Sequence, residues 1–307
     1  MRRKKVNCLF LYHPKSGKGK VAKKIGYIRK RLAERFDRVD IIATESGDDM
    51  TRYARDGAEK YDVILFSGGD GTFNRVLQGV EDGRDVRLGY IPGGTTNDVA
   101  RSLGIPRNVR GALNVILEGC EQRLDVMRLN GGRFAMYIAA AGAFTRATYT
   151  AKPASKKRFG ILAYAFEALR NEMKLRVFPL KVTCGDQTVE THSVLILNMN
   201  GRSVAGMPVN RKASMADGQM EVAIVRQKEH PGFFARIGAF VSIAALFLFH
   251  GRVRRKHLVF LRGNKFRIET GEDVVWDLDG EEGMRGCVDV ELLPRRMQLF
   301  VPKKKKI

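Results

Sequence analysis

The chain has 307 residues, with 55 Lys and Arg against 33 Asp and Glu, and a formal net charge of +22 at pH 7. Hydrophobic residues make up 44% and charged residues 29%, which excludes a disordered chain and a bundle of membrane spans. This length favours two domains over one. The four cysteines lie far apart and form no CxxC pair, so a reduced, cytoplasmic compartment is expected rather than a disulfide framework.

Residues 1–125 alternate between buried-strand and helix patterns. The strands are expected at Val6–Tyr12, Val39–Ala43, Val63–Phe66 and Leu88–Ile91, and the helices at Val21–Phe36, Met50–Lys60, Thr72–Gly79 and Asp98–Leu103. This alternation predicts a parallel, doubly wound sheet, an α/β domain. Ligands of such sheets bind beyond the carboxyl ends of the strands.

Residues 126–307 have a different sequence pattern. Short β-rich segments such as KLRVFPLKVTC and DVVWDLD alternate with Gly, Asn, Asp or charged turns. Many strands with few helices predict a mainly β, antiparallel sandwich as the second domain. The last residues could return to the first domain. Helices are expected only at Gly160–Met173 and in the apolar stretch at Phe233–Phe249.

The apolar stretch is too short to be taken as a membrane span. Its 17 residues would rise about 25 Å as a helix, less than the ~30 Å of a hydrocarbon core, and Arg236 lies within it. Uniform apolarity is typical of a buried helix and equally of one that docks at a membrane interface. The sequence leaves both interpretations open.

Three Gly-rich loops follow predicted strands of the first domain. The central loop, Ser67–Asn74, has three glycines and precedes a helix, a pattern that predicts a phosphate cradle of backbone N–H groups. It lacks the GK[ST] of a Walker A loop and the spacing of GxGxxG. The loops His13–Lys20 and Pro92–Asp98 add lysines and hydroxyls. Together with Asp70 and Asp98 they predict a nucleoside triphosphate with a divalent metal.

These loops carry a family resemblance. HPKSGKG, GGDGTFN and PGGTTNDVARSLGIP, in that order, resemble the NPxSGxG, GGDGTxN and PxGTxND…GIP motifs of the bacterial diacylglycerol kinase-like lipid kinases. That family shares its catalytic domain with diacylglycerol, sphingosine and ceramide kinases. A late DGE, Asp279–Glu281, matches as well, whereas His13 stands where the family usually has Asn. The resemblance implies the NAD-kinase/diacylglycerol-kinase-like fold.

The resemblance also implies roles for individual residues. Glu281 would be the general base for the lipid hydroxyl, with Glu282 as the alternative, and Asp70 and Asp98 would be catalytic. Asp98 and Asp125 resemble the aspartates of a metal–water network. A second-domain Mg²⁺ would be held by Ser214, Asp217 and Gln219, although an Asp-Gly pair more often marks a hairpin turn. The implied ATP-binding residues are Pro14, Lys15, Ser16, Gly17, Thr44, Gly68, Gly69, Asp70, Gly71, Thr72, Asn74 and Thr95.

The positive charge raises the question of partners. Basic clusters are spread over Arg2–Lys5, Lys152–Arg158, Arg252–Lys256 and Lys303–Lys306, without a recognisable nucleic-acid motif, so we expect an anionic membrane surface rather than nucleic acid. The leading hypothesis is a cytoplasmic lipid kinase associated with the membrane periphery, using ATP and Mg²⁺, most plausibly on diacylglycerol. Sphingoid, ceramide and polyprenol acceptors stay open, as does a homodimer. The alternatives are an NAD kinase or other small-molecule kinase, and a nucleic-acid-binding or inactive scaffold protein.

Overall fold

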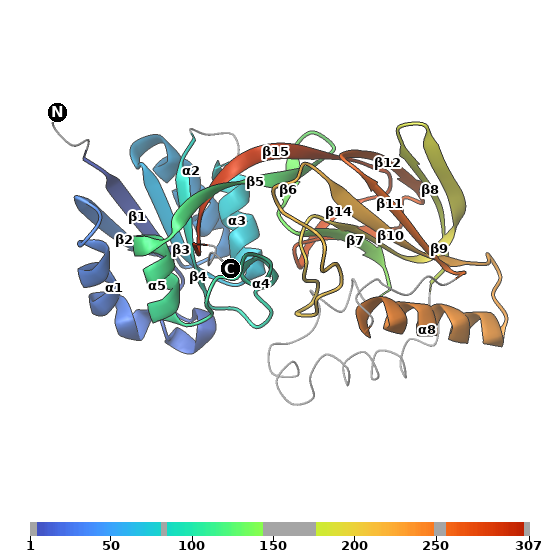
Figure 1. Ribbon diagram of the computed structural model, residues 1–307, viewed down its shortest axis with the longest axis horizontal. Helices are drawn as coiled ribbons and strands as arrows, with labels where there is room; N and C mark the ends of the chain where they lie inside the picture. Colours follow the sequence, from blue (N-terminus) through green and yellow to red (C-terminus); the bar gives the residue numbers. More distant parts are fainter. Residues whose placement is uncertain (1–4, 81–84, 144–175, 249–255, 304–307) are drawn as a thin grey trace. The chain divides into compact units, whose positions relative to one another are not determined.

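The computed structural model describes residues 5–80, 85–143, 176–248 and 256–303, and the chain divides into two compact units (Figure 1). The first comprises residues 1–126 and 294–307, and the second residues 127–293. The chain leaves the first unit in β5 (Cys120–Leu129) and returns in β15 (Val288–Val301). The helix expected at Gly160–Met173 lies outside the described residues, as do the basic residues Lys152–Arg158.

The first unit is built on the parallel sheet that the sequence predicts. Its strands are β1 (Asn7–Tyr12), β2 (Arg38–Ala43), β3 (Val63–Gly68) and β4 (Arg87–Pro92). They pair in the order β2-β1-β3-β4, all parallel, and the end of β15 pairs with β4 in the same sense. Every residue of β3 is buried, as expected for a strand covered on both faces.

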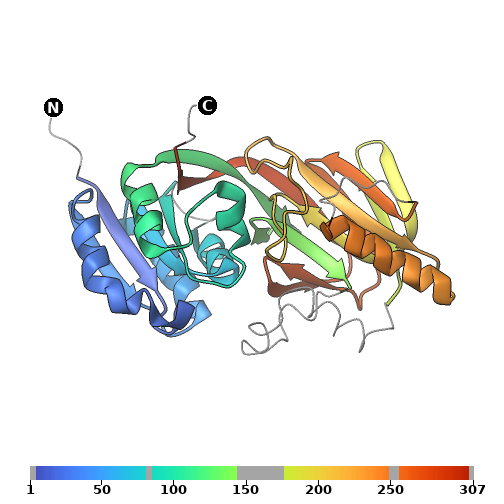
Figure 2. The same ribbon diagram turned by 60° about the horizontal axis from the view of Figure 1, so that its bottom comes forward.

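Helices cover both faces of this sheet (Figures 1 and 2). One pair that packs together is α1 (Ile25–Leu32) with α5 (Val109–Glu118), and the other is α2 (Gly47–Lys60) with α3 (Asp70–Val80). The short α4 (Asp98–Leu103) follows the third loop. These two helical layers confirm the doubly wound α/β prediction.

The helix expected at Val21–Phe36 is shorter than predicted. The 3₁₀ turns η1 (Ser16–Gly19) and η2 (Ala22–Lys24) precede α1, which ends at Leu32. No side chain caps the start of α1 at Lys24. Uncapped N–H groups at a helix end are commonly satisfied by tightening into 3₁₀ geometry. In contrast, Ser46 accepts the Asp49 N–H at 3.1 Å, and α2 begins three residues before the predicted start.

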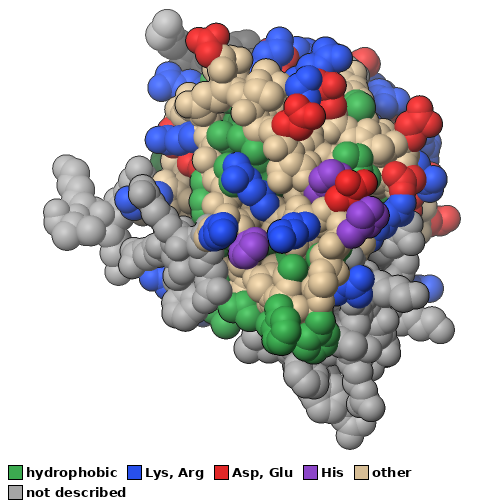
Figure 3. All heavy atoms as spheres, turned by 90° about the vertical axis from the view of Figure 1, so that its right-hand side faces the viewer, with side chains coloured by type: hydrophobic (Ala, Val, Ile, Leu, Met, Phe, Trp, Pro, Cys, Tyr) green, Lys and Arg blue, Asp and Glu red, His purple; other side chains and the backbone are tan. Residues whose placement is uncertain are grey.

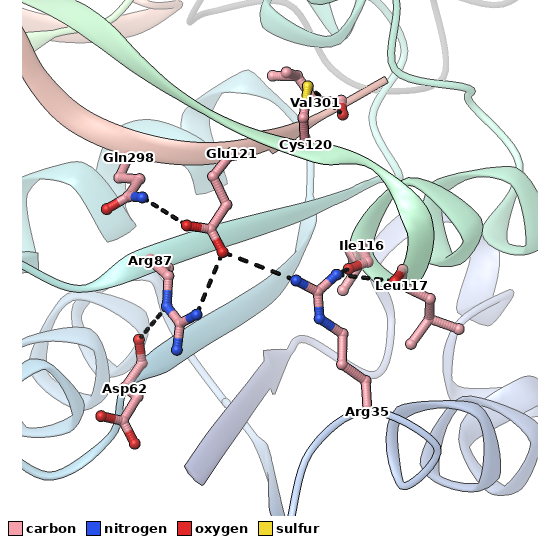
Figure 4. Close-up of polar contacts among 9 residues, drawn as sticks. All are labelled: Arg35, Asp62, Arg87, Ile116, Leu117, Cys120, Glu121, Gln298 and Val301. Carbon is pink, nitrogen blue, oxygen red and sulfur yellow. Dashed lines mark hydrogen bonds and ion pairs between the residues drawn. The ribbon is translucent and has the colours of Figure 1, made fainter. Parts of the chain in front are cut away.

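Glu121 ties the returning end of the chain to the first unit (Figure 4). Its carboxylate accepts from Gln298 Nε2 at 2.7 Å, from Arg87 Nη1 at 3.3 Å, and pairs with Arg35 at 3.8 Å. The Arg35 guanidinium also donates to the Leu117 carbonyl at 2.9 Å, near the end of α5. One partly buried carboxylate therefore joins β15, β4 and the segment after α1.

The second unit is antiparallel and β-rich, which confirms the sandwich prediction. Strands β14, β13, β7 and β9 pair in that order. Strand β9 also pairs with β10, and β10 pairs with β11. Strand β8 pairs with both β9 and β12. Its core includes the fully buried Trp276 and Phe266. The bounds are β6 Arg133–Ala135, β7 Ile138–Gly142, β8 Phe178–Cys184, β9 Gln187–Met199, β10 Met220–Gln227, β11 Leu258–Gly263, β12 Lys265–Thr270, β13 Val275–Leu278 and β14 Glu281–Arg285.

The apolar stretch forms α8 (Phe233–Leu248), which packs against β10. Ala239, Ile243 and Leu246 are buried in this contact. Among the described residues, no helix has the length and apolarity needed to cross a bilayer. Helix α8 therefore packs on the second unit along one side, while Phe233 and Phe234 are exposed.

Candidate functional site

Three Gly-rich loops meet at one edge of the first unit's sheet. The first loop (13–20) follows β1, the central loop (67–74) follows β3, and the third loop (92–98) follows β4. Thr44 follows β2 and is buried. Because β2, β1, β3 and β4 are adjacent and parallel, all four segments lie at the carboxyl ends of neighbouring strands.

The central and third loops are packed backbone against backbone. The Gly93 N–H donates to the Gly68 carbonyl at 2.6 Å. A Cβ added to Gly94 would lie 2.5 Å from the Gly69 Cα, a contact that real Cβ atoms do not make. A Cβ on Gly68 would in turn meet the Thr72 side chain at 2.1 Å. Glycine is thus required here by the contact between the loops themselves, a reason that sequence reasoning missed.

The first loop is locked to the third by another glycine. Gly17 has a left-handed φ of +57°, and a Cβ there would lie 2.8 Å from the Gly93 carbonyl oxygen. Both the backbone conformation and the close approach exclude a side chain. The loop residues Pro14, Lys15, Lys18 and Lys20 are exposed, which leaves three lysines at the surface of the loop.

His13 explains how this loop tolerates the missing family asparagine. Its Nδ1 accepts the Lys15 N–H at 3.2 Å, and its Nε2 lies 3.2 Å from the Glu45 carbonyl oxygen. These two contacts fit a ring whose Nδ1 accepts and whose Nε2 donates. A histidine therefore provides one acceptor and one donor at the turn, the same complement that an asparagine side chain offers.

Asp70 connects the central loop to the third loop and α4. Its carboxylate accepts from the Thr96 hydroxyl at 3.0 Å and from the Val99 N–H at 3.2 Å. The side chain is only 6% exposed. Burial raises the pKa of the Asp70 carboxyl, although the hydrogen bonds from Thr96 and from the backbone N–H groups at the start of α4 oppose the rise. In this structure Asp70 positions backbone, a role the sequence did not suggest.

Tyr90, which the sequence analysis did not single out, completes the same network from β4. Its hydroxyl oxygen lies 3.1 Å from the Gly68 carbonyl oxygen and 3.2 Å from Asn97 Oδ1, and it can donate to either acceptor. Asn97 Oδ1 also accepts the Gly94 N–H at 2.9 Å, and Asn97 adopts a left-handed φ of +50°. Burial, with the charges of Asp70 and Asp98 nearby, raises the pKa of Tyr90 well above its ordinary value, so it stays a donor.

The remaining predicted nucleotide residues lie around these loops. Thr44 Oγ1 is 3.4 Å from the Tyr12 carbonyl oxygen, and the buried Asn74 accepts from Gln78 at 3.2 Å on α3. Thr95 is exposed, and its carbonyl accepts from Arg107 Nη2 at 2.6 Å. Arg101 similarly donates to the next carbonyl, that of Thr96, at 3.1 Å. Two arginines thus bring positive charge to the third loop.

The two aspartates of the predicted metal–water network, Asp98 and Asp125, are fully buried. Asp98 is the first residue of α4. Asp125 accepts the N–H of Arg295 at 2.8 Å, where Arg295 adopts a left-handed φ of +53°. That contact gives Asp125 a structural function at the bend of β15 within the first unit.

The DGE segment of the second unit is organised by its aspartate. Asp279 is 1% exposed and has a left-handed φ of +55°. Its carboxylate accepts three consecutive backbone N–H groups, those of Met136 at 2.6 Å, Tyr137 at 2.9 Å and Ile138 at 3.1 Å. Glu281, two residues later, is partly exposed at the start of β14. The buried clamp therefore fixes the turn that presents Glu281.

The predicted second-domain metal residues lie in one turn before β10. Asp217 accepts the Gln219 N–H at 3.1 Å and pairs with Arg262 at 3.0 Å. Arg262 also pairs with Glu221 at 3.3 Å. Mg²⁺ prefers carboxylate and carbonyl oxygens as ligands. The Asp217 carboxylate and the backbone carbonyls of Ser214 and Gln219 are therefore groups of the right type for this ion. No group of three or more His, Cys, Asp or Glu side chains able to hold a metal occurs among the described residues.

Comparisons with known proteins match both halves of the chain. The diacylglycerol kinase catalytic domain model matches residues 7–129, and the YegS C-terminal NAD kinase beta sandwich-like domain model matches residues 138–301. Two curated relatives are diacylglycerol kinases. The protein from Bacillus subtilis is 28% identical over 96% of each chain, and that from Staphylococcus aureus is 27% identical over 95% of this chain and 91% of its own.

Solved structures show the same likeness. A diacylglycerol kinase structure from Bacillus anthracis superposes with a TM-score of 0.75 at 25% identity, covering 98% of each chain. Yeast NADH kinase, solved with NADH, has a TM-score of 0.55 at 11% identity, covering 99% of this chain and 85% of that one. At that identity the yeast enzyme shows a shared fold alone.

Proposed function

Since the chain belongs to the diacylglycerol kinase-like lipid kinase family, we propose that it transfers the γ-phosphoryl group of ATP to diacylglycerol, forming phosphatidic acid. The lipid hydroxyl oxygen forms the new bond to phosphorus, the bond to ADP breaks, and the hydroxyl proton passes to a base. The observation that carries this proposal is the packed edge of three Gly-rich loops at the ends of β1, β3 and β4, where the kinase domain model matches.

The nucleotide would be held by the first unit. Backbone N–H groups of the Gly-rich loops and the start of α3 suit phosphate oxygens, since both present donors to an anion. Lys15 and Lys18 of the first loop, with Arg101 and Arg107 at the third, supply positive charge for a triphosphate. The Asp70, Tyr90 and Asn97 hydrogen bonds hold these loops in place, so little reorganisation is needed when the nucleotide binds.

Magnesium is part of the proposal. Mg²⁺ bound to ATP would neutralise charge on the transferred phosphoryl group. In the second unit, the Asp217 carboxylate with the carbonyls of Ser214 and Gln219 would hold a further ion. The Asp217 side chain is 30% exposed and pairs with Arg262, so occupation of this site requires that pair to loosen.

Glu281 is the proposed general base. A carboxylate can accept the hydroxyl proton as the oxygen attacks phosphorus, and such catalysis typically contributes about 10²–10⁴-fold. The partial exposure of Glu281 leaves it accessible to a substrate, while the Asp279 clamp fixes the preceding turn. Glu282 is more exposed than Glu281, and it lies outside the DGE motif. These differences favour Glu281 over its neighbour.

The acceptor would be reached at the cytoplasmic face of an anionic membrane. A net charge of +22 favours such a surface, where each basic residue contributes about 1 kcal/mol. Vesicle binding should weaken steeply with salt, since the Debye length falls from ~10 Å at 0.1 M to ~3 Å at 1 M. Nucleic acid is not the expected partner, and a homodimer is a separate prediction to be tested by sedimentation.

The proposal is tested by incubating the purified protein with γ-labelled ATP, Mg²⁺ and a total lipid extract supplemented with NAD. The label should appear in phosphatidic acid and disappear when diacylglycerol is removed from the extract. Label in a sphingoid, ceramide or polyprenol phosphate would correct the acceptor and keep the lipid kinase. Label only in NADP would identify the small-molecule kinase alternative. No label in any product would contradict the proposed activity.

A further inference from the structure

Five of the seven large hydrophobic side chains that are exposed among the described residues lie on one helix. Phe234 is 85% exposed, Phe233 65% and Leu248 50%. All three belong to α8, as do Ile237 and Val241, which are also exposed. We call the set Phe233, Phe234, Ile237, Val241 and Leu248 the apolar face of α8. Phe260 on β11, the strand paired with β10, is exposed too.

This apolar face is continuous and lies opposite the packed side of the helix. Phe233, Ile237, Val241 and Leu248 are spaced by four, four and seven residues, which places them on one side of an α-helix. The residues buried against the second unit, including Ala239, Ile243 and Leu246, occupy the other side. Packing on β10 therefore explains only half of the apolarity of α8.

Charge around the apolar face is positive. Arg236 is the single charged residue of α8, and no acidic residue lies within the helix. Lys228, His230 and Lys256 are exposed in the described segments that flank it. Glu229, the acidic residue of these segments, lies 3.9 Å from His192. Figure 3 shows hydrophobic side chains at the lower edge of this end of the molecule, with Lys, Arg and His side chains directly above them.

We infer that the apolar face of α8 inserts into the headgroup–acyl boundary of an anionic membrane, with the helix lying along the surface. Sixteen residues rise about 24 Å, too short to cross the ~30 Å hydrocarbon core. A helix with an apolar side and basic neighbours has the composition of an interfacial element.

This inference rests on the proposed lipid kinase only for the choice of a membrane as partner. Its test is therefore made without turnover, so that it can fail while the kinase assignment stands. The chain has one tryptophan, Trp276, which is fully buried and gives a constant background. F234W places a fluorescent reporter on the apolar face. Y27W places a matched reporter at a 40% exposed aromatic position of α1, in the first unit.

Each variant is mixed with vesicles of phosphatidylglycerol and phosphatidylcholine whose acyl chains carry bromine, a collisional quencher. F234W should be quenched well beyond the wild-type background, whereas Y27W should not. Co-sedimentation of F233S/F234S with unbrominated vesicles should fall at least about tenfold. The reason is that this variant lacks the two large apolar side chains that would move from water into the membrane. Binding of ATP by this double variant should equal that of the wild type.

Three results would overturn the inference. Equal quenching of F234W and Y27W, or unchanged sedimentation of F233S/F234S, would place the contact with lipid elsewhere. A wild-type dimer in lipid-free solution that F233S/F234S dissociates, together with no quenching of F234W, would assign the apolar face to a second copy of the chain.

Discussion

Asp70 in the first unit and Asp279 in the second can be compared by their position in the sequence, their burial and their hydrogen bonds. Each begins an Asp-Gly dipeptide shortly after a buried strand, and each is almost fully buried. Each carboxylate accepts donors from a segment distant in sequence, Thr96 and Val99 for Asp70, and residues 136–138 for Asp279. The aspartates that stand out in the sequence therefore hold backbone in place.

The two aspartates differ in their surroundings. Asp70 starts α3 and accepts from the first turn of α4, so its charge faces two helix N-termini, which favour an anion. Asp279 lies in a turn with a left-handed φ and relies on three strand N–H groups. The first arrangement fixes the loops that are proposed to bind the nucleotide. The second fixes the turn before Glu281, the proposed general base.

The largest effect on ligand binding is expected from the glycines that Asp70 helps to hold. G94A places a Cβ 2.5 Å from the Gly69 Cα, so the central and third loops must separate. ATP affinity measured by calorimetry should fall at least about a hundredfold, or about 2.7 kcal/mol. G93A is the matched control, because its Cβ would meet the protein no closer than 3.5 Å, and its free energy of unfolding should stay within about 0.5 kcal/mol of wild type. Normal ATP binding by G94A would show that ATP binding does not need the close contact between the central and third loops.

Removal of the Asp279 clamp should lower the stability of the protein. D279A leaves three buried N–H groups without their acceptor, and each such group costs about 1–3 kcal/mol. We expect the free energy of unfolding in urea to fall by about 3 kcal/mol or more. D279N keeps one acceptor oxygen and tolerates the left-handed backbone, so its loss should be about half as large. Equal stability of D279A and wild type would show that the carboxylate does not hold the turn.

The buried charge of Asp70 should appear as a pH dependence. The pKa of Asp70 is raised above its ordinary 3.8, so the folded state favours the protonated carboxyl. As pH rises from about 3.8 through the raised pKa, wild type should lose stability relative to D70N, and above that window the difference should become constant. Urea unfolding of both proteins across this range measures the difference. A change of opposite sign would mean that the N–H donors outweigh burial.

The smallest effect concerns Glu121, which ties β15 to the first unit. E121Q keeps the shape but removes the charge facing Arg35 and Arg87. Because the group is partly exposed, the loss in unfolding free energy should be about 1 kcal/mol or less. Amide hydrogen exchange in residues 298–301 should accelerate while that of β3 stays unchanged. Uniform acceleration throughout the sheet would indicate a global rather than a local role.

The sequence predicted the first unit well because its signals are local. Buried runs bounded by Gly-rich turns located β1 to β4 within a few residues, and the pattern at Asp98–Leu103 matched α4. The failure at Val21–Phe36 arose because the cap of a helix depends on one side chain that periodicity does not report. The apolarity of α8 predicted a helix but could not say that only one side of it is buried.

Contacts at long range could not be predicted for the candidate site. The Asp279 clamp joins residues more than 140 positions apart, and no local pattern marks it. The donor role of His13 Nε2 depends on the Glu45 carbonyl, 32 residues further along the chain. Tyr90 gave a weak signal, since a tyrosine within a buried strand needs a hydrogen-bond partner. The functions assigned to Glu281, Asp98 and the Mg²⁺ residues remain predictions from family motifs.

The central claim is that the first unit binds MgATP while Glu281 accepts the proton of the lipid hydroxyl. It is tested most directly by comparing E281Q with wild type in one preparation, with kcat on diacylglycerol and MgATP affinity measured side by side. E281Q should lower kcat by about 10²–10⁴-fold and leave MgATP affinity unchanged. Near-normal kcat in E281Q would contradict the claim.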